Sequence, residues 1–497
     1  MDPFQNVPNE ILVEIFCLCL PTEAKYQIPD PLQAPLLLTH VCSTWRNVAT
    51  RTSALWQSLA LLQNDASLTP HEAVDAMESL ARQFMLWSTN SRQLPLDVKI
   101  FLHCPHCPGL PGMEHPFLVF YWSTFWQPIF ESLLERHSNR IRKLYLSIDS
   151  LEQGVSVYKI PNYPMPLLES LQLSMDYFGD DTPVKISNFS QSPRLRKVIL
   201  DVWFTPTTID LPWSRLTHLI ITRSFPWELF YFIVHECPIL ETLSLVFRED
   251  ETRPTEPLTL FFLRELKLEL TSSSESPVPN FFVFLDLPVL QDLELSMDVD
   301  STGEAFEWLP MSLDYYHFRN QIHNLRKLHL GYHDISSTML LDLLRFTPLL
   351  EDFAVDAILV SYITFLEGIT WHPHSEREPL IPRLEIFHLY VEINHINRDD
   401  AVPDPTFPFT HSNFLSMVSS RTRSALSTPD RSTDNRPVSP LKELFLCVEL
   451  VEEPHALDLH ALQQEFNTRD EFRGIQFSSR VSNSKNTWHA RGPVETW

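Results

Sequence analysis

The sequence predicts an α/β protein with two parts: an all-helical N-terminal segment, and a long array of short parallel strands connected by helices or loops. Two observations predict it. Apolar residues in the first sixty positions recur at helical spacing. From about residue 141, a pattern of apolar, two variable, apolar, one variable and apolar residues recurs along the 497-residue chain. The alternation that ends each pattern is typical of a short strand with one buried face.

The N-terminal segment consists of three apolar blocks, NVPNEILVEIFCLCL, PLLLTHVCSTWRNVA and SALWQSLAL. Pro8 suits a first helical turn, where its missing N–H leaves no bond unmade, and the helix dipole favours the charge of Glu10 there. Each block repeats apolar residues along one helical face. A segment this small buries a low fraction of its surface, so we expect a partner to cover its remaining apolar side chains. The alternative is an ordinary helical cap on the following domain.

The order of these residues resembles an F-box, the motif through which a substrate receptor docks on the Skp-type adaptor of an SCF ubiquitin ligase. The resemblance covers residues 4 to 61 and rests on Val7-Pro8-x-Glu10-Ile11-Leu12, Val41-Cys42-x-x-Trp45-Arg46 and Leu55-Trp56. It has two departures. Val7 replaces the usual leucine, and the link from 21 to 35 is long and proline-rich, similar to the insertion in F-box proteins of mushroom-forming (basidiomycete) fungi.

The resemblance implies which residues contact the adaptor. They are Pro8, Ile11, Leu12, Ile15, Phe16, Leu37, Val41, Cys42 and Trp45. Trp56 is expected instead to pack the F-box against the next region of the chain. The resemblance also implies a cullin scaffold as a partner, reached through the adaptor.

The array begins at Ile141, and its later starts are Leu168, Leu195, Leu216, Leu240, Leu263, Leu290, Leu325, Leu350, Leu384 and Leu441. Apart from the last interval of 57 residues, the starts lie 21 to 35 residues apart. This spacing and pattern resemble a leucine-rich repeat, which implies a solenoid of parallel strands with helices on the convex side. The asparagine or cysteine expected after the last leucine of each repeat is missing, so we expect an irregular arc of roughly ten units.

Helices are expected between some of the strands. In SFPWELFYFIVHECP, Pro226 can open a helix, and Leu229, Phe232 and Ile233 share one face. The segment SSTMLLDLLRFTP shows the same spacing. Strand, helix and strand at this spacing predict a parallel sheet with helices on its other side.

The predicted domains are the F-box at 4–61, a helical linker region at 62–140 and a leucine-rich repeat domain at 141–497. Residues 419 to 440 lack apolar periodicity and are rich in Ser, Thr and Arg, which predicts a disordered insertion in the repeat domain. Within it, Thr428 and Ser439 each precede a proline, a pattern consistent with proline-directed phosphorylation.

The composition excludes several functions. A net charge of −25 argues against binding the phosphate backbone of nucleic acids or anionic membranes. Only 9 glycines are present and none forms a phosphate-binding loop, which argues against a nucleotide-binding enzyme. The start of the chain resembles no secretory signal, no apolar run is long enough to cross a membrane, and seven cysteines lack a disulfide spacing. We therefore expect an intracellular protein of the cytoplasm, the nucleus or both.

Chemistry-bearing motifs are nearly absent. His103-Cys104-Pro105-His106-Cys107 crowds four metal-type ligands into five residues without a second pair, so we interpret it as a loop with incidental Cys and His. No catalytic motif is found. The sequence therefore predicts no enzyme, no catalytic residue, no metal and no cofactor.

In a solenoid sheet the leucines point inward and the variable strand positions line the opposite face. The candidate substrate residues on that face are Lys143, Tyr145, Gln172, Lys197, His218, Lys267, Asp292, Glu294, Lys327, His329, His388 and Tyr390. Their alternative interpretation is a merely solvated sheet face. The sequence thus predicts a substrate receptor of a ubiquitin ligase with an unknown protein substrate. The alternative is a leucine-rich repeat interaction scaffold not coupled to a ligase.

Overall fold

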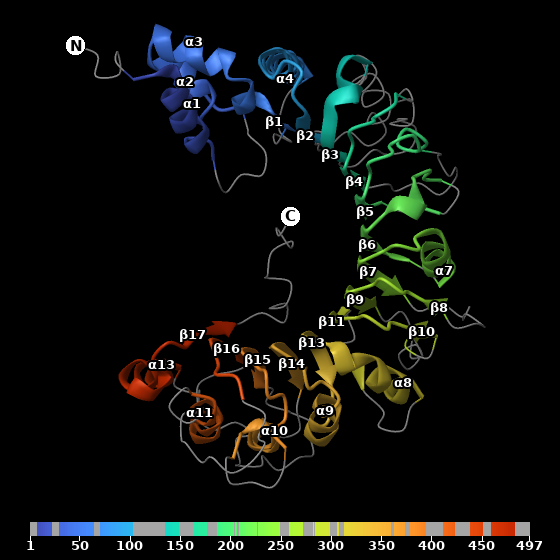
Figure 1. The fold of residues 1–497 in the computed structure, drawn as a ribbon, viewed down its shortest axis with the longest axis vertical. Helices are drawn as coiled ribbons and strands as arrows, with labels where there is room; N and C mark the ends of the chain where they lie inside the picture. Colours follow the sequence, from blue (N-terminus) through green and yellow to red (C-terminus); the bar gives the residue numbers. More distant parts are fainter. Residues whose placement is uncertain are drawn as a thin grey trace. The chain divides into compact units, whose positions relative to one another are not determined.

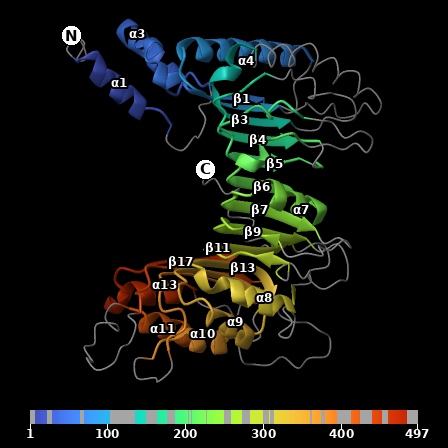
Figure 2. The same cartoon turned by 45° about the vertical axis from the view of Figure 1, so that its right-hand side comes forward.

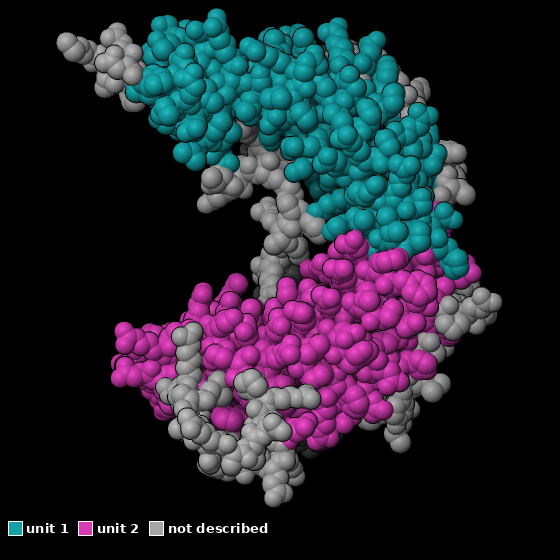
Figure 3. All heavy atoms as spheres, viewed as in Figure 1, with its two compact units in different colours: residues 1–223, 235–240 teal, residues 224–234, 241–497 magenta. Residues whose placement is uncertain are grey.

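The computed structural model describes residues 7–21, 29–63, 70–102, 135–148, 163–175, 186–202, 204–205, 208–225, 227–248, 258–271, 282, 284–298, 306–307, 313–358, 362–372, 378–393, 411–422, 438–450 and 459–482. The chain divides into two compact units, shown in Figure 3. Unit 1 comprises residues 1–223 and 235–240, and unit 2 comprises residues 224–234 and 241–497.

Unit 1 begins with helices and continues as a parallel sheet (Figure 1). Its described helices are α1 (Asn9–Leu18), α2 (Leu36–Val41), α3 (Ser43–Arg51) and α4 (Pro70–Asn90), with 3-10 turns η1 (Ser53–Trp56), η3 (Ser138–Arg140) and η5 (Trp213–Arg215). The strands are β1 (Ser58–Gln63), β2 (Leu96–Leu102), β3 (Ile141–Ile148), β4 (Ser170–Met175), β5 (Lys197–Asp201) and β6 (His218–Phe225). Each strand pairs in parallel with the next along the chain.

Unit 2 repeats the same arrangement with more helices. The described helices are α7 (Trp227–Glu236), α8 (Leu313–Gln321), α9 (Ser337–Leu344), α10 (Tyr362–Ile369), α11 (His411–Ser420) and α13 (Leu459–Thr468), with 3-10 turns η6 (Ile322–Asn324) and η7 (Asp470–Phe472). The main sheet runs in chain order through β7 (Thr242–Arg248), β9 (Glu265–Thr271), β11 (Asp292–Asp298), β13 (Lys327–Asp334), β14 (Asp352–Ile358), β15 (Ile386–Ile393), β16 (Glu443–Leu450) and β17 (Gln476–Ser482). A short strand, β12 (Phe306–Glu307), pairs with β13.

The predicted α/β class and its parallel strands are confirmed. A strand begins at Ile141, and two residues after each of the ten later pattern starts, from Leu168 to Leu441. Along these strands buried and partly exposed residues alternate, as in Lys197–Asp201. The side chains on one face, such as Leu328 and Leu330 of β13, are fully buried. The leucines therefore form the core and the variable positions form the other face.

Helices cover that core on one side of β13 to β17, where α9, α10, α11 and α13 lie side by side (Figures 1 and 2). The two predicted helices are both present, as α7 and α9. Between β7 and β11, however, the described connections contain a short parallel pair of β8 (Leu258–Thr259) and β10 (Leu285–Asp286). Helices thus accompany only some of the repeats in the part of the chain that the structure describes.

The sheet extends further at both ends than the sequence predicted. β1 and β2 precede β3, and β17 follows β16, each in parallel register with its neighbour. The region expected to be a helical linker does contain a long helix, α4, but it also contains β2. The sequence LDVKIFL alternates apolar and polar residues at its start, and Val98 and Ile100 are fully buried against the same core. This burial outweighs the helical character of the neighbouring segments.

The segment predicted to be a disordered insertion is packed at both ends. Arg421 and Thr422 are buried directly after α11, and Val438 is buried just before β16. The backbone N–H of Ser439 donates to the Pro382 carbonyl at 2.7 Å. Thr428 lies outside the described residues.

Arg421 has an unusual environment, because its guanidinium is fully buried. Its nitrogens donate to three backbone carbonyls: that of Ile369 at the end of α10, that of Leu380 at 2.8 Å and that of Ile381 at 3.1 Å. Ile381 has a φ of 43°, a strained value for a β-branched residue. Burial lowers the pKa of Arg421 to about 10. This side chain satisfies carbonyls that the strained turn and the helix end leave without partners.

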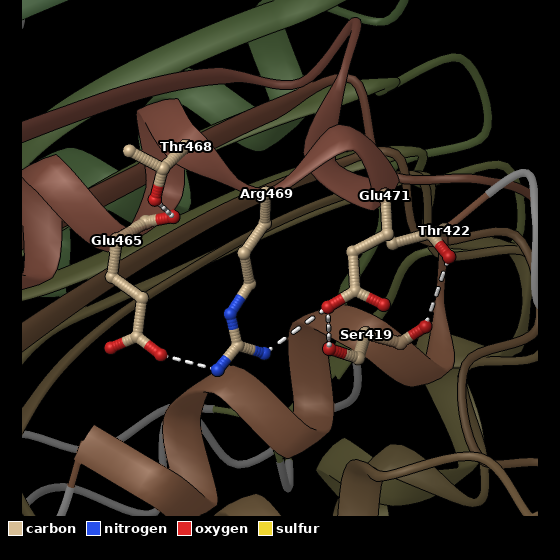
Figure 4. Close-up of polar contacts among 6 residues, drawn as sticks. All are labelled: Ser419, Thr422, Glu465, Thr468, Arg469 and Glu471. Carbon is tan, nitrogen blue, oxygen red and sulfur yellow. Dashed lines mark hydrogen bonds and ion pairs between the residues drawn. The ribbon is translucent and has the colours of Figure 1, made fainter.

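Polar contacts link the last helices of unit 2 (Figure 4). Arg469, directly after α13, pairs with Glu465 one turn earlier and with Glu471 at 3.1 Å. The hydroxyl of Ser419 on α11 donates to the same Glu471 carboxylate at 3.1 Å. Glu471 therefore connects the end of α11 to η7, next to the last strand of the sheet.

Candidate functional site

The helical segment α1 to α3 is organised by local capping. The backbone N–H groups of Ile11 and Leu12 both donate to the Pro8 carbonyl at 3.1 Å, so Pro8 is the N-cap of α1, one position before the first turn in which the sequence placed it. Cys42 begins α3, where its sulfur accepts a hydrogen bond from the Trp45 N–H at 3.4 Å. Arg46 donates to the Thr39 carbonyl in α2 at 2.7 Å and ties the two helices together.

The interior of this segment is aromatic. Leu12 and Phe16 of α1 are buried, and the Phe16 ring lies 4.9 Å from that of Trp45. Trp56 is fully buried, donates to the Ala49 carbonyl at 2.9 Å and meets the Trp87 ring of α4 edge-on at 4.9 Å. The expectation that Trp56 packs the helical segment against the following region is therefore confirmed.

The exterior of the same helices carries an apolar stripe of Ile11, Ile15, Leu37 and Val41. These side chains are 46, 38, 41 and 54% exposed. Within α1, Ile11 and Ile15 are separated by four residues, as are Leu37 and Val41 within α2, so each pair lies on one helical face. Leu18, one turn further along α1, is 83% exposed. Such a concentration of exposed aliphatic side chains is typical of an interaction site.

The structure corrects two of the nine predicted adaptor contacts. Leu12 and Phe16 point into the segment, because the helical face that packs on α3 needs large apolar residues to fill it. They support the stripe rather than belong to it. Among the rest, Pro8 is exposed, while Cys42 and Trp45 are partly exposed and serve as the α3 cap and the partner of Phe16.

The second candidate surface is the outward face of the unit 2 sheet. Parallel register aligns the variable positions in rows across the strands. The first row is Thr242, Glu265, Asp292, Lys327, Asp352, Ile386 and Glu443, and the second is Ser244, Lys267, Glu294, His329, Ala354, His388 and Phe445. The predicted residues Lys267, Asp292, Glu294, Lys327, His329 and His388 are thus brought together on one face.

Ion pairs run along these rows. Lys267 lies 3.1 Å from Glu294, and Lys327 lies 3.6 Å from Asp292. Further along, His329 Nε2 lies 3.3 Å from Asp352, and His388 Nε2 lies 3.5 Å from Glu443. The lysines of β9 and β13 therefore face carboxylates of β11, and the histidines of β13 and β15 face carboxylates of β14 and β16.

The pKa of the Asp352 carboxyl on this face is lowered from its ordinary value. Burial alone raises its pKa, but the hydrogen bond from His329 and the nearby charges of His329, His388 and Lys327 together lower it. A carboxylate that stays ionised while mostly buried is stabilised by its partners in the folded state.

An aromatic cluster adjoins these carboxylates. The Phe445 ring lies 5.6 Å from that of His388 and 5.5 Å from that of Tyr390. A third row, two positions further along each strand, contains Glu269 of β9, Asp356 of β14 and Tyr390 of β15. Together, Asp352, His388, Tyr390, Glu443 and Phe445 form what we call the β14–β16 patch. Tyr390 was predicted as an exposed candidate, but its side chain is mostly buried against its neighbours.

Unit 1 presents a separate face with a different character. Lys143 lies 3.7 Å from Asp97, which also accepts two hydrogen bonds from Arg142. The ammonium of Lys99 lies 4.5 Å above the Tyr145 ring. Gln172, Lys197 and His218 are partly exposed at the same strand positions. This face carries more lysines than carboxylates.

The prediction missed Asp352, Glu443 and Phe445, although the sequence contained the signal. They occupy the variable positions of the repeats that start at Leu350 and Leu441, and extending the same rule to those repeats finds them. Asp97 and Lys99 were missed because their strand was taken as helix.

The predicted metal-like cluster from His103 to Cys107 lies outside the described residues. Across the described ranges, no group of three His, Cys, Asp or Glu side chains is arranged to hold a metal ion. The cysteines at 17, 19, 42, 237 and 447 are free thiols. In the same ranges no helix combines the length and apolar character that crossing a membrane requires.

Comparison with known proteins finds similarity among solved structures alone. No family model matches the chain, and no curated protein matches it. Among solved structures, the chain is similar to one described as the crystal structure of a TLR13–ssRNA13 complex, with 14% sequence identity and a TM-score of 0.34. The similarity covers 79% of this chain and 46% of the other, so this chain spans less than half of that one.

Proposed function

We propose that this protein is a non-catalytic substrate receptor of an SCF-type ubiquitin ligase. In this proposal the α1–α3 segment docks on a Skp-type adaptor, and through it on a cullin scaffold, while the repeat sheet recruits a protein target. The observation that carries the proposal is the apolar stripe. Ile11, Ile15, Leu37 and Val41 are exposed at positions where the F-box resemblance implies adaptor contacts.

The physical basis of docking is apolar burial. Each exposed aliphatic side chain that a partner covers contributes about 1 kcal/mol, at roughly 25 cal/mol per Å² of area removed from water. Four such side chains on two helices that both pack on α3, supported by the Phe16–Trp45 interior, provide a preorganised surface.

The test is co-purification of the full-length chain with a Skp-type adaptor. We expect wild-type protein to bind, and Ile11→Asp combined with Val41→Asp to abolish binding, because both introduced charges would be buried without a partner. Both positions are exposed in the free protein, so the variant should keep its fold, measured by circular dichroism and thermal unfolding. Leu12→Asp is unsuitable, because Leu12 is buried and the change would unfold the segment.

Leu86→Asp on α4 is the matched control, because Leu86 is 41% exposed, like Leu37. It should leave adaptor binding intact. A wild-type chain that fails to bind the adaptor would refute the receptor proposal and favour the interaction scaffold not coupled to a ligase. Equal loss of binding in Leu86→Asp and in the stripe variant would show that the stripe is not the docking surface.

A further inference from the structure

The outward face of the unit 2 sheet has a charge excess that specifies its partner. Over the three aligned rows from β7 to β16, the face carries seven carboxylates and two lysines. The carboxylates are Glu265, Glu269, Asp292, Glu294, Asp352, Asp356 and Glu443. Carboxylates therefore outnumber lysines on this face, and the opposite face of the sheet is occupied by the leucine core.

The excess is concentrated where the sheet also presents aromatic rings. Lys267 and Lys327 pair with carboxylates of β9 and β11, and Lys327 of β13 also stands beside Asp352 in register, whereas β15 and β16 contribute no lysine to the three rows. In the β14–β16 patch, Asp352 and Glu443 pair with histidines, which carry a full charge only when protonated. Phe445 lies between His388 and Tyr390 in the same patch. Negative charge and aromatic surface therefore coincide there.

This combination matches one kind of side chain. A guanidinium group forms paired hydrogen bonds with a carboxylate and stacks on an aromatic ring, while its long stem packs on apolar surface. The Glu443 carboxylate is 42% exposed and stands one row from Phe445 on the same strand, so one arginine can reach both. An aliphatic or acidic partner would leave these carboxylates desolvated without compensation.

We infer that the β14–β16 patch binds an arginine-rich segment of the partner protein. The inference rests on the proposed function, because it names the target class for the same sheet face, and it holds equally for a scaffold without a ligase. The Glu443 carboxylate accepts hydrogen bonds from the guanidinium, and the guanidinium stacks on the Phe445 ring. Asp352, held by His329, supplies the field that favours a cation.

The experiment measures binding of a fluorescein-labelled peptide of alternating arginine and serine to the full-length protein by fluorescence anisotropy. The reference peptide has glutamine in place of each arginine. We expect the arginine peptide to bind and the glutamine peptide not to bind. Glu443→Gln should weaken binding about tenfold, the effect of losing one charge-assisted hydrogen bond. Phe445→Ala should weaken it about fivefold through loss of the ring.

Glu465→Gln is the control for general attraction to an acidic protein. Glu465 is 37% exposed, pairs with a cation and lies in α13, on the helical side. It should leave peptide affinity unchanged. Equal weakening in Glu465→Gln and Glu443→Gln, or an arginine peptide that binds no better than the glutamine peptide, would overturn the inference.

Adaptor co-purification is read separately on the same proteins. Loss of peptide selectivity with intact adaptor binding would refute the target class alone. Failure of adaptor binding with intact selectivity would refute the ligase proposal alone. Thermal unfolding of each variant confirms that it is folded, and Glu443→Gln is suited to this because its side chain is half exposed.

Discussion

At the scale of single residues, buried charged side chains show how much of the fold depends on polar contacts that periodicity cannot reveal. Arg421 lies in a stretch whose composition predicts disorder, yet it is fully buried and donates to three carbonyls. Composition averages over a window, whereas this side chain acts through contacts 40 to 52 residues away. The sequence therefore misplaces the boundary of the insertion for a physical reason.

Replacing Arg421 tests that role. Arg421→Met keeps the length and packing of the side chain but removes all its donors, so three buried carbonyls lose their partners. We expect the free energy of unfolding to fall by about 3 kcal/mol, measured by urea denaturation. Arg383→Met is the control, because Arg383 is exposed nearby, and it should change stability by less than about 0.5 kcal/mol. Similar effects of the two changes would contradict the assigned role.

Asp352 makes stability depend on pH. Its pKa in the folded protein is lowered, against the effect of burial, by the hydrogen bond from His329 and by neighbouring charges. A carboxyl with a lowered folded pKa contributes stability above its unfolded pKa of about 3.9, and that contribution is lost as pH falls through the folded value. Asp352→Asn should therefore lose more stability at pH 7 than at a pH below the folded pKa of Asp352.

The measurement is urea denaturation of both proteins at the two pH values. The difference in unfolding free energy between wild type and Asp352→Asn should shrink on acidification. Asp286→Asn, at an exposed position of β10, should show no such dependence. A difference for Asp352→Asn that is constant with pH would show that the carboxylate is not stabilised by its ionised state.

At the scale of elements, the strands were predictable because each carries its own signal. Two leucines separated by one residue, such as Leu328 and Leu330, mark a buried strand face in isolation. The pairing of the strands is also implied, because consecutive repeats stack in chain order. Whether the connection between two strands forms a helix was less predictable. Between β7 and β11 the described connections contain β8 and β10, and each of these strands has only two residues, too few to show a periodic pattern.

The joint between the helical segment and the sheet shows the same limit. The sequence predicts that Trp56 packs against the next region of the chain, and the structure identifies its contact there as Trp87 of α4. Trp87 also donates to the Ser58 carbonyl of β1 at 2.9 Å. Two tryptophans thirty-one positions apart give no local pattern, so only the folded chain pairs them. This contact joins the N-terminal helical segment to α4, and both belong to unit 1.

The candidate surfaces were only partly predictable for the same reason. Helical periodicity identifies which residues are apolar but not which side of the helix faces inward. Leu12 and Phe16 were therefore grouped with Ile11 and Ile15, although their exposures are opposite. On the sheet, alternation assigns each residue to one of the two faces of a strand, but it does not give the exposure of the side chain, and Tyr390 is mostly buried.

At the scale of the whole molecule, the two proposed binding surfaces belong to different compact units. The apolar stripe is built on the helices of unit 1, and the β14–β16 patch on the sheet of unit 2. Each has its own supporting core: the Phe16–Trp45 pair beneath the stripe, and buried residues such as Phe353 and Phe387 beneath the patch. Substitutions with no shared partners usually have additive effects.

This separation predicts that the two binding activities are independent. Ile11→Asp with Val41→Asp should lose the adaptor and bind the arginine peptide as wild type does. Glu443→Gln should weaken peptide binding and co-purify with the adaptor normally. The protein with all three changes should lose the adaptor as the stripe variant does. Its free energy of peptide binding should equal that of Glu443→Gln within about 0.5 kcal/mol. A stripe variant that also loses the peptide, while remaining folded, would instead show that the two surfaces are energetically coupled. A receptor that holds its target before and after it joins a ligase requires the independent outcome.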